Sequence, residues 1–172
     1  MKMGTKSLLF GAHQFVLHPM LLALAWIMLY GFPFDLRLWF AFFCHDLGYW
    51  SATDMDGPSG EKHPELGAKI MGFLFGQRWY DFTILHSRSY ARKMGKPVSR
   101  LCAADKLATA ITPIWLYVPM VCLTGEITEY IREATGFVSV ASVTGDPVVW
   151  FRDMRRYNLS WVEKNKGLTE PT

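Results

Sequence analysis

The residues of this chain with the clearest chemical potential are histidines and aspartates between positions 18 and 105. His45 and Asp46 are adjacent, follow the apolar run 38–43 and precede a loop rich in Gly, Asp and Ser. An imidazole and a carboxylate at the end of an apolar helix are costly unless something pairs with them, and a metal ion would do so. Such ligands suit manganese, iron, zinc or nickel.

Four further residues of the same kinds complete an ordered set in the sequence. In chain order it contains one histidine, the His-Asp pair, two more histidines and an aspartate: His18, His45, Asp46, His63, His86 and Asp105. Taken singly, each residue has a structural explanation as a helix cap or a satisfied buried group. Taken together, the set favours a metal site, with His13 as the alternative to His18 in the first position.

This set, with the local sequences HDLG, KHPELGA and ADKLA, resembles the HD-domain superfamily of metal-dependent phosphohydrolases over residues 13–112. The resemblance implies that Asp46 bridges two divalent transition-metal ions. One ion would take His18, His45 and Asp105, and the other His63 and His86. Iron and manganese are the expected metals, with nickel, zinc and magnesium as alternatives.

Charged residues near these ligands are candidates for substrate binding and proton transfer. Arg88 and Arg92 are four apart on an expected helix that follows His86, and Lys106 follows Asp105. All three could hold a substrate phosphate, and a solvated helix surface is the alternative. Glu61 and Glu65 flank His63 and are the candidate proton donors to the leaving group, between which the sequence does not choose.

The resemblance implies an enzyme of the HD type, a metal-dependent phosphohydrolase or phosphodiesterase, and the basic residues near the ligands favour the same activity. It would hydrolyse a nucleotide or another small phosphoester with a metal-bridging hydroxide, and Asp46 would be central to catalysis. Two alternatives stay open. The same set of ligands resembles that of mixed-valent di-iron HD-type oxygenases, and a catalytically silent HD domain would serve as a binding module. The Gly-Tyr-Pro signature of cyclic-di-GMP phosphodiesterases is absent from the sequence, so that substrate is not supported.

Length and composition favour one soluble-type domain. The chain has 172 residues, of which 51% are hydrophobic, and its charge-free stretch 19–30 is too short to cross a bilayer. Three cysteines in apolar settings predict reduced thiols and a cytoplasmic location. The net charge of +3 is too small to indicate a nucleic-acid partner. A small phosphorylated substrate is the expected partner, with peripheral membrane contact and homo-oligomerisation left open.

The pattern of apolar residues, caps and breakers predicts an all-α fold. We expect a single HD-type helical bundle over residues 1–163, with a metal-binding core over 13–112, a C-terminal helical extension and a disordered tail over 164–172. Asp35 and Asp146 are good N-caps, and Gly76 and Gly95 are stop signals. The alternating segment 137–143 reads as a strand or an extended loop. The expected helices cover residues 13–30, 36–46, 64–75, 77–94, 99–111, 113–123 and 126–134, and a last one begins at 147.

Overall fold

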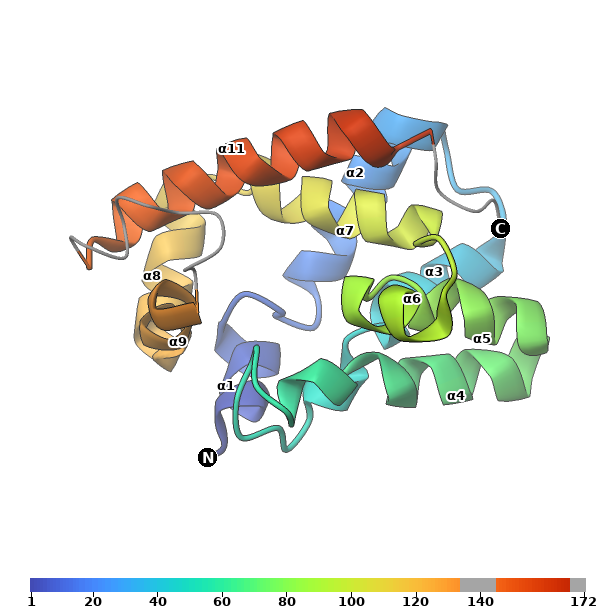
Figure 1. Cartoon of the computed structure of the whole chain (residues 1–172), viewed down its shortest axis with the longest axis horizontal. Helices are drawn as coiled ribbons and strands as arrows, with labels where there is room; N and C mark the ends of the chain where they lie inside the picture. Colours follow the sequence, from blue (N-terminus) through green and yellow to red (C-terminus); the bar gives the residue numbers. More distant parts are fainter. Residues whose placement is uncertain (134–144, 168–172) are drawn as a thin grey trace.

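A computed structural model describes residues 1–133 and 145–167 of the chain, and within these ranges it is all helical (Figure 1). No strand occurs among these residues, which confirms the all-α class. The expected strand-like segment 137–143 lies outside the described residues, as do positions 168–172 of the expected tail. The helices are α1 (Met3–Phe10), α2 (Leu17–Tyr30), α3 (Leu36–Cys44), α4 (Pro64–Phe75), α5 (Gln77–Ile84), α6 (Arg88–Met94), α7 (Arg100–Ile111), α8 (Ile114–Thr124), α9 (Glu126–Glu133) and α11 (Pro147–Asn165), with 3-10 turns at Leu47–Tyr49 and Gly60–Lys62.

Several helix boundaries follow directly from capping chemistry. The Asp35 carboxylate accepts a hydrogen bond from the Arg37 N–H at 2.9 Å, and α3 begins at the next residue. Asp146 accepts from the Val148 N–H at 2.8 Å, and Pro147 occupies the first position of α11. Each carboxylate satisfies an N–H group that the first helical turn leaves unpaired, so these two expected boundaries are confirmed.

Other boundaries differ from the prediction. Residues 3–10 form a helix of their own, and α2 begins at Leu17 rather than at position 13. The expected helix 77–94 is two helices, because Ser87 caps α6 by accepting from the Tyr90 N–H at 3.4 Å. The tail expected from position 164 is also wrong at its start, since α11 continues to Asn165.

Three buried clusters hold the helices together, the smallest of which joins α4, α5 and α6 through Ala68, Ile84, Leu85 and Ala91. In the largest one, α2, α3, α5 and α7 contribute side chains such as Leu22, Trp26, Phe42, Phe82 and Leu101. The second one joins α1, α8, α9 and α11 through residues that include Leu8, Tyr117, Trp150 and Phe151, and it also contains Tyr49 and Met55. Figure 1 shows α11 lying along α7 and reaching α8, so this last helix bridges the two parts of the bundle.

The cysteines and the apolar helices can also be placed. All three cysteines are free. Cys102 is buried, Cys44 is half-buried, and Cys122 is exposed although its neighbours in the sequence are apolar. Among the described residues, no single helix has the length and apolar character needed to span a bilayer. The pair α7 and α8 reaches that length together, but the two helices meet at a bend of 99°.

Candidate metal centre

The six histidine and aspartate residues come from five separate segments. His18 lies in the first turn of α2, His45 and Asp46 directly follow α3, and His63 immediately precedes α4. The other two are His86, in the break between α5 and α6, and Asp105, on α7. Five of the six are buried, with at most 8% of the residue exposed, and His63 is half-buried. The fold therefore brings residues 87 positions apart in the chain (18 to 105) into one buried cluster.

Asp46 occupies the middle of this cluster. Its Oδ2 lies 3.1 Å from Nε2 of His45 and 3.5 Å from Nε2 of His18. Its Oδ1 lies 3.6 Å from Nε2 of His86 and 3.8 Å from Nε2 of His63. Each carboxylate oxygen thus faces a different pair of imidazoles. Asp46 with His18 and His45 forms one group, Asp46 with His63 and His86 forms the other, and in each group the ligand atoms lie within 4.8 Å of one another. Asp105 adds a second carboxylate to one half, with Oδ1 at 3.2 Å from Nε2 of His18.

Three of the imidazoles are oriented by the backbone of their own segment. Nδ1 of His45 lies 2.9 Å from the carbonyl oxygen of Phe42, and Nδ1 of His86 lies 2.6 Å from that of Thr83. Nδ1 of His63 lies 2.7 Å from the carbonyl oxygen of the residue three positions earlier. A carbonyl oxygen only accepts hydrogen bonds, so each Nδ1 must carry the proton. In the neutral imidazole, each Nε2 then presents a lone pair to the centre of the cluster.

Between His63 and His86 this arrangement leaves two nitrogen lone pairs facing one another. The Nε2 atoms of His63 and His86 are 3.1 Å apart, and those of His18 and His45 are 3.3 Å apart. Oδ2 of Asp46 is buried and accepts no hydrogen bond. Lone pairs and a carboxylate at such distances repel unless a positive charge lies among them. The donor set and its geometry therefore fit one or two metal ions, and either half could hold one.

The close packing of these buried groups shifts the pKa values of His63, Asp46 and His45. Burial lowers the pKa of His63 to about 3, and the neighbouring His86 adds to this shift, so the His63 imidazole is neutral at ordinary pH. For Asp46, burial favours the neutral acid, but electrostatic attraction from neighbouring histidines, His45 above all, outweighs it and holds the pKa well below its usual range. Burial likewise opposes ionisation of His45, yet the Asp46 charge raises its pKa above the ordinary value. The centre thus combines a fixed carboxylate with at least one neutral imidazole.

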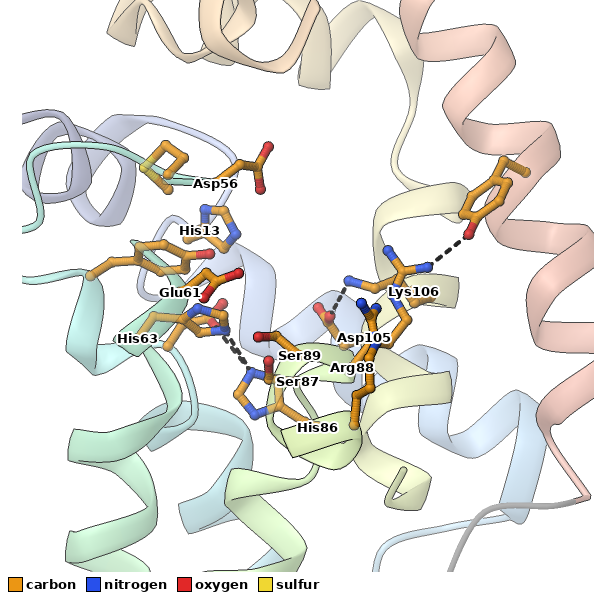
Figure 2. A pocket seen from close by; sticks show the side chains of 15 residues that line it. His13, Asp56, Glu61, His63, His86, Ser87, Arg88, Ser89, Asp105 and Lys106 are labelled. Atoms are coloured by element: carbon orange, nitrogen blue, oxygen red, sulfur yellow. Dashed lines mark hydrogen bonds and ion pairs between the residues drawn. The ribbon is translucent and has the colours of Figure 1, made fainter. Parts of the chain in front are cut away.

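A cavity of about 450 Å³ opens onto the cluster. Asp46, His63, His86 and Asp105 form part of its wall, and so do all three candidate phosphate ligands, Arg88, Arg92 and Lys106. Figure 2 shows Arg88 and Lys106 on one side of the cavity and Asp56 and Glu61 on the other. The positive wall is therefore beside the Asp105 half of the cluster.

The two candidate proton donors are placed differently. Glu61 lines the cavity, although its carboxylate also pairs with Lys93 at 3.0 Å. Glu65 is not among the lining residues; it accepts a short hydrogen bond from the Tyr90 hydroxyl and lies 3.5 Å from Lys69. Only Glu61 is therefore in a position to reach a molecule bound in the cavity.

The sequence did not identify Tyr157 as part of this site. Its hydroxyl accepts a hydrogen bond from Nη1 of Arg88 at 2.8 Å, and the Arg88 guanidinium also lies over the Trp161 ring, 5.9 Å from its centroid. Lys106 is held by Oδ2 of Asp105 at 3.0 Å. Tyr157 lies 69 positions after Arg88, and no motif in the sequence indicates that α11 would reach the cavity. Ser87 and Ser89 also line the cavity and were not identified from the sequence, although they flank Arg88.

His13 lies on the cavity wall but outside the cluster. Its Nδ1 lies 2.9 Å from the Ser7 hydroxyl, and its ring packs on Tyr49 with centroids 4.4 Å apart. Burial lowers the pKa of His13 to about 4. The geometry thus places His18, rather than His13, among the residues that could hold a metal.

Helix α9 anchors two loops that border the cavity. The Glu126 carboxylate is fully buried and accepts from the Ala12 N–H at 3.3 Å, next to His13. Glu129, one turn later, accepts from the N–H groups of Met55 and Asp56 at 2.8 and 2.9 Å. Two buried carboxylates of one short helix therefore fix the loops that carry His13 and Asp56.

Comparison of the chain with protein-family models, with curated proteins and with solved structures gave no match. What the structure supports is an all-helical fold with a buried His/Asp cluster that could hold metal.

Proposed function

We propose that this chain is a metal-dependent phosphohydrolase of the HD type, with two divalent ions in the cluster and a small phosphoester as substrate. The observation that carries the proposal is Asp46, whose two carboxylate oxygens face separate pairs of imidazoles beside a cavity with a positive wall. The ordered set of ligands in the sequence, which resembles that superfamily, points the same way.

The proposed roles of the residues follow from their places in the cavity. Bound divalent ions would supply Lewis acidity toward a phosphoryl oxygen and lower the pKa of water. Asp46 holds the two halves of the cluster together, and the Nδ1 contacts fix the imidazoles before substrate arrives. Arg88 donates hydrogen bonds to the substrate phosphate from a position set by Tyr157, and Arg92 and Lys106 add positive charge on the same wall.

Glu61 is the proposed proton donor to the leaving group. It faces the cavity from the loop that precedes α4, across from the basic residues, where the alcohol part of a phosphoester would lie if its phosphate contacted Arg88. Glu65 does not share this position, and we assign it no catalytic part.

The test is metal reconstitution combined with a substrate screen. Apo protein is reloaded anaerobically with manganese, magnesium or nickel and offered nucleotides and small phosphoesters. We expect release of phosphate or of a nucleoside monophosphate at a rate that does not depend on oxygen. Glu61→Gln should lower this rate while metal content stays unchanged, and Glu65→Gln is its matched control.

Two outcomes would overturn the proposal. Activity that appears only with iron, and only while oxygen is consumed in step with product, would make the protein an oxygenase. Metal-replete protein that turns over no phosphoester and consumes no oxygen across a broad screen would make it a binding module.

A further inference from the structure

The hairpin of α2 and α3 exposes an apolar surface. Apart from Gly31, every exposed residue between positions 15 and 36 has an apolar side chain, and Phe40 continues the series on α3. We call this surface the hairpin face. Its members are Phe15, Val16, Met20, Leu24, Ile27, Met28, Phe32, Phe34, Leu36 and Phe40.

These residues follow one side of α2, the connection and the exposed side of α3, where Phe40 also contacts Phe75 of α4 with ring centroids 5.5 Å apart. Met20, Leu24, Ile27 and Met28 are spaced by three or four positions on α2, so they lie on one side of the helix. On α3, Leu36 and Phe40 are four apart. Phe15 before α2 contacts Phe43 near the end of α3, with ring centroids 5.9 Å apart, and Phe32 contacts Phe34 in the connection at 4.8 Å. The hairpin is therefore joined at both ends.

The face has the size of a protein interface. Its residues are between 39% and 85% exposed, and a large apolar side chain has roughly 150–250 Å² of surface, so together they expose roughly 1,000 Å². The largest apolar patch of an ordinary monomer covers only about 300–600 Å². A stable dimer of standard size buries about 800 Å² on each partner.

The charges beside the face favour a protein partner over an anionic membrane. None of its ten residues is charged. Near the hairpin tip Arg37 is paired with Asp35, with Nη2 at 2.7 Å from Oδ2, and Arg100 is held over the Tyr30 ring, 5.2 Å from its centroid. An amphipathic helix that binds anionic lipid needs basic residues along its border. Aromatic residues and Met, which dominate the hairpin face, are enriched where protein copies meet.

We propose that the hairpin face is the interface of a homodimer, in which the α2–α3 hairpin of one copy packs on that of a second copy. The same patch serves both copies in such a two-fold arrangement, so one apolar face completes the interface. The opposite side of α2 packs on α7, and none of the ten residues lines the cavity. Both cavities therefore remain open in the dimer.

The test is the mass of the full-length protein in solution at micromolar concentration, by light scattering after gel filtration. We expect twice the chain mass of 19.7 kDa. Leu24→Glu, which would bring one carboxylate from each copy into the interface, should raise the dissociation constant roughly a hundredfold, since like charges in an interface cost several kcal/mol. Phe34→Glu is a second variant, chosen because Phe34 is the most exposed member of the face and least needed for folding.

The matched control is Leu123→Glu on α8, which is also largely exposed but lies outside the hairpin. It should leave the dimer intact, and circular dichroism should show the same helix content in all variants. A monomeric wild-type protein would overturn the proposal, and so would a dimer that both hairpin variants leave unchanged. Sedimentation of a monomeric wild type with lipid vesicles, lost in Leu24→Glu, would assign the face to a membrane instead.

Discussion

Replacing Asp46 with asparagine should remove both metal ions rather than one. The substitution keeps the shape of the side chain but removes its negative charge. In the native protein each carboxylate oxygen of Asp46 lies 3.1–3.8 Å from the Nε2 atoms of two histidines. An ion present at a hundredfold excess over its dissociation constant adds about 2.7 kcal/mol to the free energy of unfolding, so two ions add about 5 kcal/mol. For a chain of this length that corresponds to roughly 10–20 °C in Tm.

The assay combines metal analysis of the purified protein with thermal unfolding in the presence and absence of added metal. Wild-type protein should hold close to two ions, counted per chain, and show the rise in Tm, whereas Asp46→Asn should show neither. Asp56→Asn is the control, because Asp56 lines the same cavity without belonging to either ligand group. If Asp46→Asn retained one ion, Asp46 would serve only one half of the cluster, and the reasoning from its two oxygens would be refuted.

Three further predictions concern the cavity wall and its anchors. Arg88→Ala should lower kcat/KM by roughly 10- to 100-fold without loss of metal, as expected for one charge-assisted hydrogen bond, and Tyr157→Phe should cost less; unchanged kinetics would assign Arg88 to the surface. Burial raises the pKa of Glu126 above its ordinary value of 4.5, so the folded state binds this proton more tightly than the unfolded state. The free energy of unfolding should then fall as pH rises from 4.5 through the raised pKa, and Glu126→Gln should flatten this part of a pH series of urea titrations. An unaltered slope would show that Glu126 is already ionised at low pH. Gly11→Ala should destabilise the protein by about 1–3 kcal/mol, because its Cβ would lie 1.7 Å from Oε1 of Glu126, whereas the same change at Gly167 meets no atom within 4 Å and should be neutral in thermal unfolding.

The helices that could be predicted from the sequence are those whose ends carry their own signal. Asp35 and Asp146 hold N–H groups two residues ahead, so a local pattern is enough to locate the start of α3 and α11. The break between α5 and α6 carried a weaker signal. Ser87 stands in a stretch that otherwise continues a helical pattern, and its role as a cap depends on how His86 turns into the cluster.

The candidate site divides in the same way. The His-Asp pair could be recognised because two polar residues end an apolar run. The other four candidate ligands could be recognised from the order of histidines and aspartates along the chain. Tyr157 could not be found, because its contact with Arg88 depends on how α11 lies along α7 in the folded chain. Glu65 has the same chemistry and spacing from His63 as Glu61, yet the turn of α4 directs it to Tyr90. Residue type and spacing therefore predict ligands better than they predict the wall around them.

The three Nδ1 contacts have a consequence for how such a centre could be assembled. In each case the carbonyl oxygen lies only three residues before the histidine, so ring orientation is encoded within one turn of chain at Phe42–His45, Gly60–His63 and Thr83–His86. The tertiary fold then only has to bring together three imidazoles whose orientation is already set by the local backbone. Little conformational entropy is then lost when an ion is captured, so more of the attraction between the ligands and the ion is expressed as binding affinity.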